Sequence, residues 1–314
     1  MEPLRENSED TQANRLIKFG MRLGVSAALH PFEYSKVLIQ IGYEPIAPRD
    51  GRTFLGRPAL FLPNIFQYVK HIKSVDGLAG CYRGLTPKLI GTVVSVIGSK
   101  KVADSLQLDA YDPNESKDSE ELTEDECYER FLKELKRDLI LHASGIIIAQ
   151  PFQVISIRMM AQFVGRETIY TSVWSSIKEI FSQDGLLGFF SGLTPKLIAE
   201  LTCIALTSMT CYLVNKYYLR DQVSRNYFAG FAQFIYGTIL YPMQVVSTCM
   251  VVNGTRLEIG NPPYTPVHRN WTECWVHLKS TNQHKRGSSL FWRYYCPPVN
   301  TAPSFVPFPK LSKY

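Results

Sequence analysis

The sequence lacks the residue patterns that mark common enzymes and metalloproteins. Its seven cysteines include no CxxC pair, so they predict neither a zinc site nor a disulfide framework. The HExxH, P-loop, GxSxG and Rossmann glycine patterns are also absent. The first twelve residues carry four acids against one arginine, which predicts neither a secretory signal nor a transit peptide. We therefore expect no catalysis, cofactor, metal or nucleic-acid partner.

Charge is also scarce, at 20% of the 314 residues, and it is missing from long stretches. Residues 227–252 carry no charge, residues 197–214 carry only Glu200, and residues 139–164 carry Arg158 as their only full charge. A helix rises about 1.5 Å per residue, so about 20 apolar residues cross a hydrocarbon core of about 30 Å. Several membrane-spanning helices are predicted, with buried helices of a large soluble α-protein as the alternative.

One stretch of the sequence occurs twice. Residues 76–90 and 184–198 match at 11 of 15 positions, and both end in Gly-Leu-Thr-Pro-Lys-Leu-Ile. A period of 108 residues predicts a duplicated structural unit. We interpret the twin stretches as scaffold, at the start of the second long helix of each unit.

Each unit is predicted to hold a proline-kinked helix, a short surface helix and a second long helix. Proline kinks a helix because it removes one backbone hydrogen bond. The long helices are expected at 14–43, 86–106, 131–164, 194–218 and 224–252, the short ones at 66–75, 172–182 and 269–279, and a loop at 42–63. After Arg293 only 21 residues remain, five of them proline, which is too few for another spanning helix.

These patterns divide a single membrane domain, residues 1–314, into five parts. Residues 109–126 hold nine acids and one lysine, which is typical of a solvated loop. The parts are repeat one (14–108), an acidic loop (109–130), repeat two (131–219), a truncated repeat three (223–293) and a proline-rich tail (294–314).

The first unit carries two short motifs, at residues 31–36 and 76–84, that resemble the repeat signature of the mitochondrial carrier family. That signature is Pro-x-Asp/Glu-x-x-Lys/Arg, followed by Asp/Glu-Gly-x4-aromatic-Lys/Arg-Gly. Residues 31–36 and 76–84 match it in full, so the chain resembles this family. The later units depart from it, with Gln153 and Gln244 in the acidic position and Ser156 and Ser247 in the basic one.

These departures, together with residues 36–45, 162–167 and 261–266, resemble the mitochondrial carrier homolog proteins. The resemblance implies an all-α membrane protein with a threefold repeat of proline-kinked helices and no sixth transmembrane helix. It further implies a multi-pass protein of the outer mitochondrial membrane that inserts α-helical and tail-anchored clients and docks pro-apoptotic proteins. A transporter of a small anionic metabolite and a non-catalytic receptor or scaffold are the alternatives.

An insertase of this kind needs polar side chains at membrane depth, because a charge at the bilayer centre costs about 2.5–3.5 kcal/mol. Glu33 and Lys36 lie three residues apart, so a simple pair on one helix face stays open. We interpret Glu200 as a charge with no basic residue nearby in its own helix, which favours a functional position. Tyr241 and the glutamines are equally suited to interhelical hydrogen bonds. The predicted lining of a lipid-open groove is Glu33, Lys36, Gln150, Arg158, Glu200, Tyr241 and Gln244.

Overall fold

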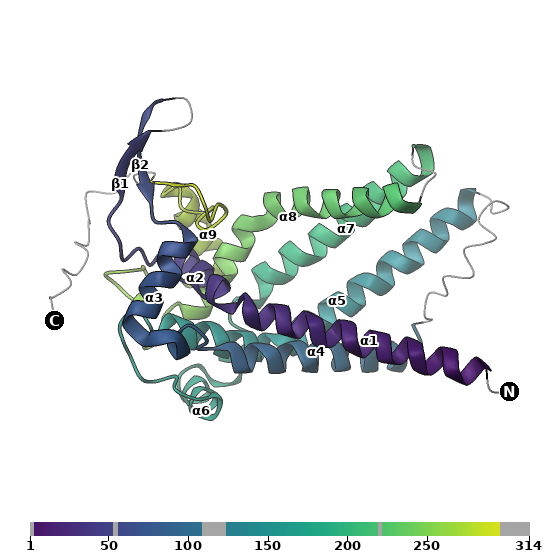
Figure 1. Ribbon diagram of the computed structural model, residues 1–314, viewed down its shortest axis with the longest axis horizontal. Coiled ribbons are helices and arrows are strands. Elements are labelled where there is room, and N and C mark those ends of the chain that lie inside the picture. Colours follow the sequence, from purple (N-terminus) through teal and green to yellow (C-terminus); the bar gives the residue numbers. More distant parts are fainter. Residues whose placement is uncertain (1–2, 53–55, 109–123, 219–221, 296–314) are drawn as a thin grey trace.

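A computed structural model describes residues 3–52, 56–108, 124–218 and 222–295, and these are mostly helical (Figure 1). The segments 109–123 and 296–314, which hold most of the predicted acidic loop and tail, lie outside the described residues. The α-helices are α1 (Pro3–Ala28), α2 (His30–Ile41), α3 (Ile65–Gly80), α4 (Leu85–Ser105), α5 (Glu124–Ala161), α6 (Val173–Asp184), α7 (Leu193–Tyr217), α8 (Gln222–Val252) and α9 (Trp271–Ser280). Two 3₁₀ helices are η2 (Gly185–Phe190) and η3 (Glu258–Gly260).

The three prolines that were predicted to kink helices all lie within helices of the structure. Pro151 lies inside α5 and Pro242 inside α8. The helix predicted over residues 14–43 is divided at Leu29 into α1 and α2, and Pro31 lies in the first turn of α2, where its missing N–H costs least. The predicted acidic loop ends earlier than expected, because α5 already begins at Glu124.

A small antiparallel sheet occupies part of the predicted loop 42–63. Its strands β1 (Arg49–Arg52) and β2 (Pro58–Leu62) form a hairpin, and β3 (Arg293–Tyr294) adds to β2 with Leu62 opposite Arg293. The sequence predicted a loop here and an all-α fold, so this sheet was missed. In the third unit, β3 stands at the position where the twin stretches of the first two units lead into the long helices α4 and α7.

Arg293 fixes the third strand to the first part of the chain. Its guanidinium pairs with Glu44, donates to the carbonyl of Pro63 at 3.0 Å and stacks 5.4 Å from the ring centre of Tyr68. The Tyr68 hydroxyl in turn donates to the carbonyl of Tyr43 at 2.7 Å. Burial, followed by the Glu44 carboxylate, raises the pKa of Tyr68 well above its usual value, so this hydroxyl stays a donor.

The long helices extend from one end of the molecule, where α2, α3, α6, α9 and the sheet lie (Figure 1). Helix α4 packs along α5 and α7 packs along α8, while α5 also contacts α7. Helix α1 contacts α2 but packs little against the other long helices, and Ile17, Met21 and Val25 are more than half exposed on it. The main core lies where α2, α5 and α8 meet.

Three stretches of the described chain are long and apolar enough to cross a membrane. They are Asp125–Ala161, Val173–Tyr217 and Ser224–Val252. Large apolar side chains such as Leu213 on α7 and Phe234 on α8 are exposed on their outer surfaces. In water such surfaces would be unfavourable, so their place is against hydrocarbon.

Candidate functional site

A polar cavity of about 340 Å³ lies among the kinked and straight long helices. Its charged members are three lysines and two glutamates, which gives a net charge of +1. Its polar and charged lining residues are Glu33, Lys36 and Gln40 from α2, Lys88 and Thr92 from α4, Gln153 and Ser156 from α5, Lys196 and Glu200 from α7, and Gln244, Ser247 and Thr248 from α8.

Glu33 and Lys36 both line the cavity but do not pair with each other. Glu33 instead forms an ion pair with Lys88 of α4, across the cavity wall. Lys36 points its ammonium group at the ring of Tyr241, 5.2 Å from the ring centre. The sequence left open an ion pair between Glu33 and Lys36 within one helix. The structure instead has an ion pair between Glu33 of α2 and Lys88 of α4, and a cation–π contact between Lys36 and Tyr241.

Glu200 and Gln244 also line the cavity and contact each other. The amide nitrogen of Gln244 donates to the Glu200 carboxylate at 3.3 Å, which joins α8 to α7. Lys196 lies four residues before Glu200 on α7 and lines the same cavity. The interpretation of Glu200 as lacking a basic residue nearby in its own helix was therefore wrong.

Lys196 contacts amide oxygens rather than a carboxylate. Its ammonium group donates to Gln153 and, at 3.4 Å, to Gln150, both on α5. Lys88 holds the same place in the first twin stretch, and its partner Glu33 stands two residues after Pro31, as Gln153 stands two residues after Pro151. The acid-to-amide change at Gln153 thus leaves the second lysine with a neutral partner.

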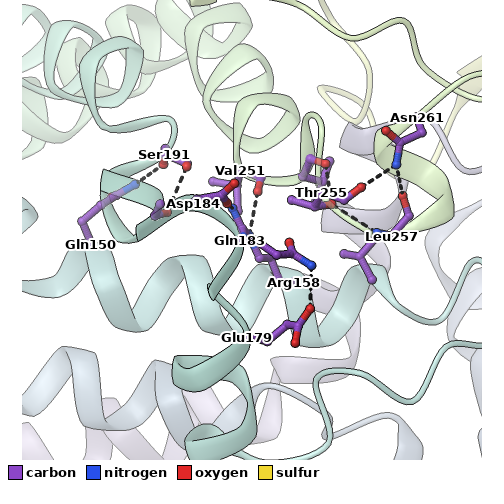
Figure 2. A network of polar contacts seen from close by, with 12 residues as sticks. Gln150, Arg158, Glu179, Gln183, Asp184, Ser191, Val251, Thr255, Leu257 and Asn261 are labelled. Atoms are coloured by element: carbon purple, nitrogen blue, oxygen red, sulfur yellow. Dashed lines mark hydrogen bonds and ion pairs between the residues drawn. The ribbon is translucent and has the colours of Figure 1, made fainter. Parts of the chain in front are cut away.

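Gln150 and Arg158 stand outside the lining of this cavity. The amide nitrogen of Gln150 donates to the carbonyl of Ser191 at 2.8 Å, which ties α5 to the start of α7. Arg158 is 1% exposed; it donates to Asp184 at 2.8 Å and to the carbonyl of Val251 at 3.0 Å. Figure 2 shows both residues in one polar network that joins α5, α6 and α8.

Tyr241 is buried and is not part of the lining of this cavity. Its hydroxyl accepts from the Gln40 amide at 3.0 Å and donates to the carbonyl of Arg286 at 2.8 Å. Of the seven residues predicted from the sequence, four line the cavity, and Gln150, Arg158 and Tyr241 hold the surrounding helices in place.

Two serine–glycine contacts position the walls of the cavity. Ser156 of α5 donates to the carbonyl of Gly84 at 2.8 Å, and Ser247 of α8 donates to the carbonyl of Gly192 at 2.8 Å. Both glycines have positive φ, 83° and 72°, just before α4 and α7. These serines occupy the basic position of the carrier signature, so that position now supports helix packing.

A second cavity of about 420 Å³ runs between α4 and α5. Its polar lining includes Ser95, Ser99 and His142, and it shares Ala149 and Lys196 with the first cavity. Lys196 therefore stands at the junction of the two cavities.

Comparison of the sequence with known proteins shows the family to which the chain belongs. Residues 139–222 match the family model described as "Mitochondrial carrier protein". The chain is 37% identical to "Mitochondrial carrier homolog 2" of Homo sapiens over 282 residues, which is 86% of this chain and 91% of the relative. It is 34% identical to "Mitochondrial carrier homolog 1" of Mus musculus over 310 residues, which is 92% of this chain and 78% of the relative. The chain belongs to the mitochondrial carrier homolog family.

In this member of the mitochondrial carrier homolog family, sequence reasoning missed Lys88 and Lys196 as cavity residues. Both lie in the twin stretches, which were interpreted as scaffold only. The signal was present, because a lysine retained in an otherwise apolar, membrane-depth segment of both copies is itself a polar-site candidate.

The cavity of this mitochondrial carrier homolog is lined by side chains that can bind polar and charged groups. Among the described residues no group of three or more potential metal ligands is found. Its lysines, carboxylates and amides can replace water around a polar or charged group at membrane depth.

Proposed function

We propose that this mitochondrial carrier homolog is a multi-pass protein of the outer mitochondrial membrane that inserts α-helical and tail-anchored proteins. The observation that carries the proposal is a cavity lined by three lysines and two glutamates, set among helices with apolar outer surfaces. A polar flank inside such a cavity keeps polar partners while the apolar segment of the client leaves into lipid. The cost of about 2.5–3.5 kcal/mol for a charge at the bilayer centre falls accordingly.

The proposed architecture is a threefold carrier repeat whose sixth transmembrane helix is missing. Three corresponding glycines support it, because Gly77, Gly185 and Gly287 have similar positive φ values of 74°, 65° and 74°. The three residues before the kink prolines also share a role, since His30, Gln150 and Tyr241 each contact a backbone carbonyl. In the third unit, β3 follows Gly287 instead of a helix. The weak packing of α1 supports a cavity that is open to lipid on one side.

Reconstitution of the purified protein tests the insertase proposal directly. Proteoliposomes are assayed for insertion of a tail-anchored client and, side by side, for exchange of small anionic metabolites. Saturable solute exchange without client insertion would favour the transporter alternative.

Substitution of Glu200 by Arg tests whether the cavity performs the insertion. It changes the net charge of the cavity from +1 to +3. At an effective dielectric of about 20 and roughly 8 Å, each unit charge contributes about 2 kcal/mol. The two-unit change therefore opposes each lysine of the client by about 4 kcal/mol before solvent screening, and we expect at least about tenfold slower insertion of a client with two lysines in its translocated flank. Glu129→Arg, on an exposed part of α5, is the matched control, and equal rates for both variants would contradict the role of the cavity.

The same protein is proposed to dock pro-apoptotic proteins, as the family resemblance implies. If it is instead only a receptor or scaffold, deleting the acidic segment 109–126 should abolish partner binding. On the insertase proposal the deletion spares client insertion.

A further inference from the structure

We propose that Lys196, with Gln150 and Gln153, forms a binding site for the terminal carboxylate of a tail-anchored client. This inference rests on the proposed insertase function. It adds a chemical class of ligand, a carboxylate, and places it at one lysine among the three in the cavity.

The first step is the difference between the two twin lysines. Lys88 already has an anionic partner, because it forms an ion pair with Glu33. Lys196 has only the amide oxygens of Gln153 and Gln150 within hydrogen-bond distance, and the structure places no carboxylate of its described residues in an ion pair with it. Glu200, one turn further along α7, accepts a hydrogen bond from Gln244.

The second step is the strength of the contacts available to Lys196. An ammonium group has three donors and no acceptor, so two amide contacts leave it one donor. A bond from this ammonium group to a carboxylate adds the attraction between opposite charges, which its bonds to neutral amide oxygens lack. An incoming carboxylate therefore gains more from Lys196 than from Lys88, where it would compete with Glu33.

The third step is position. Lys196 lines both the polar cavity and the second cavity between α4 and α5, so a group that passes from one to the other meets its ammonium group. Serine hydroxyls of Ser95 and Ser99 continue the polar lining beyond it.

The fourth step is the chemistry of the client. The C-terminal end of a tail-anchored protein is the end that crosses the membrane, and it carries a carboxylate whatever its sequence. That carboxylate has to be held at membrane depth at least once during insertion. Lys196, whose hydrogen-bond partners are neutral and which stands at the junction of two cavities, meets this requirement.

The experiment uses the full-length protein in proteoliposomes of phosphatidylcholine alone, which removes anionic lipid as a competing ligand. Two semisynthetic clients share one sequence with an uncharged translocated flank and end in a free carboxylate or in a carboxamide. With the wild-type protein, the carboxylate client should insert efficiently. Lys196→Gln should slow that client by about tenfold and slow the carboxamide client much less, since one charge-assisted hydrogen bond is lost.

Two further variants serve as controls. Lys196→Arg keeps the positive charge and should restore the preference for the carboxylate client, which also guards against a merely structural effect of Lys196→Gln. Lys178→Gln removes an exposed lysine of α6 and should change neither rate.

A carbodiimide, which joins amines to carboxylates without a spacer, gives a direct readout. Mass spectrometry should find the client terminus joined to Lys196. Joining to Lys36 or Lys88 alone, or equal slowing of both clients by Lys196→Gln, would overturn the inference and leave the insertase proposal intact. If the wild-type protein inserts neither client, the insertase proposal itself fails.

Discussion

Arg158 shows how a single buried charge can be structural in a membrane protein. It is 1% exposed and its charge is balanced by Asp184 at 2.8 Å. Asp184→Asn leaves the guanidinium buried without a counterion, and we expect a loss of about 3 kcal/mol of stability. The measurement is the unfolding midpoint of the detergent-solubilised protein.

The matched control is Asp76→Asn, at the same position of the first twin stretch. Asp76 pairs with Arg83 at 3.1 Å, but Arg83 is 31% exposed, so the expected loss is about 1 kcal/mol or less. Equal shifts of the midpoint for the two variants would contradict the assignment of Arg158 as a buried structural charge.

The residue scale is also where the sequence predicts least. Glu33, Lys36, Glu200 and Gln244 were predicted to line a groove, and they line the polar cavity. Arg158 was predicted to line the groove as well, but it lies outside the cavity. A charged residue in an apolar segment does not reveal in which direction its side chain points. Its partner Asp184 comes from a separate element 26 residues away, and no local spacing rule gives that contact.

At the scale of the element, glycines at the start of α4 and α7 bring neighbouring helices into close contact. A Cβ on Gly192 would lie 2.4 Å from the Ser247 carbonyl oxygen, and the φ of 72° is unfavourable for other residues. We expect Gly192→Ala to destabilise the protein by about 2–4 kcal/mol, because α8 must move away from α7. Thermal unfolding in detergent measures this, together with crosslinking between cysteines placed on the two helices.

Gly237→Ala is the control for that substitution, because Gly237 is in a helix and a Cβ there meets nothing within 4 Å. It should leave stability unchanged or raise it by up to about 1 kcal/mol. A loss for Gly237→Ala as large as that for Gly192→Ala would refute the close-contact explanation.

The elements themselves follow well from the sequence. Helices α4, α7 and α8 begin and end within two residues of their predicted bounds, because uncharged runs, prolines and the twin stretches are strong local signals. Helix α1 begins at Pro3 instead of residue 14 and α5 at Glu124 instead of residue 131, since charged segments at a helix start give no such signal. The sheet was missed because its third strand, at Arg293, pairs with a hairpin more than 230 residues earlier. Local composition around β2 does not indicate which distant segment of the chain will pair with it.

At the scale of the whole molecule, that sheet joins the end of the third unit to the first. Arg293 is 7% exposed, pairs with Glu44 and bonds to Pro63, and the amide of Tyr295 donates to the carbonyl of Leu60 at 2.9 Å. Arg293→Gln removes the ion pair with Glu44 and the hydrogen bond from the guanidinium group to the carbonyl of Pro63. We expect β3 to separate from β2, with at least about tenfold faster hydrogen exchange at the amides of both strands, because the remaining strand pairing is only two residues long.

Arg256→Gln provides the comparison, since its pair with Glu179 at 2.9 Å involves a side chain that is 65% exposed. An exposed pair contributes about 0–1 kcal/mol, so exchange in β2 and β3 should stay at the wild-type rate. If Arg293→Gln also left that exchange unchanged, the sheet alone would hold the third unit to the first. The polar cavity takes side chains from α2 of the first unit and from α8 of the third. If β3 separates from β2 in Arg293→Gln, these two helices are held together less firmly, so client insertion should also be slower. The proteoliposome assay measures this on the same variant.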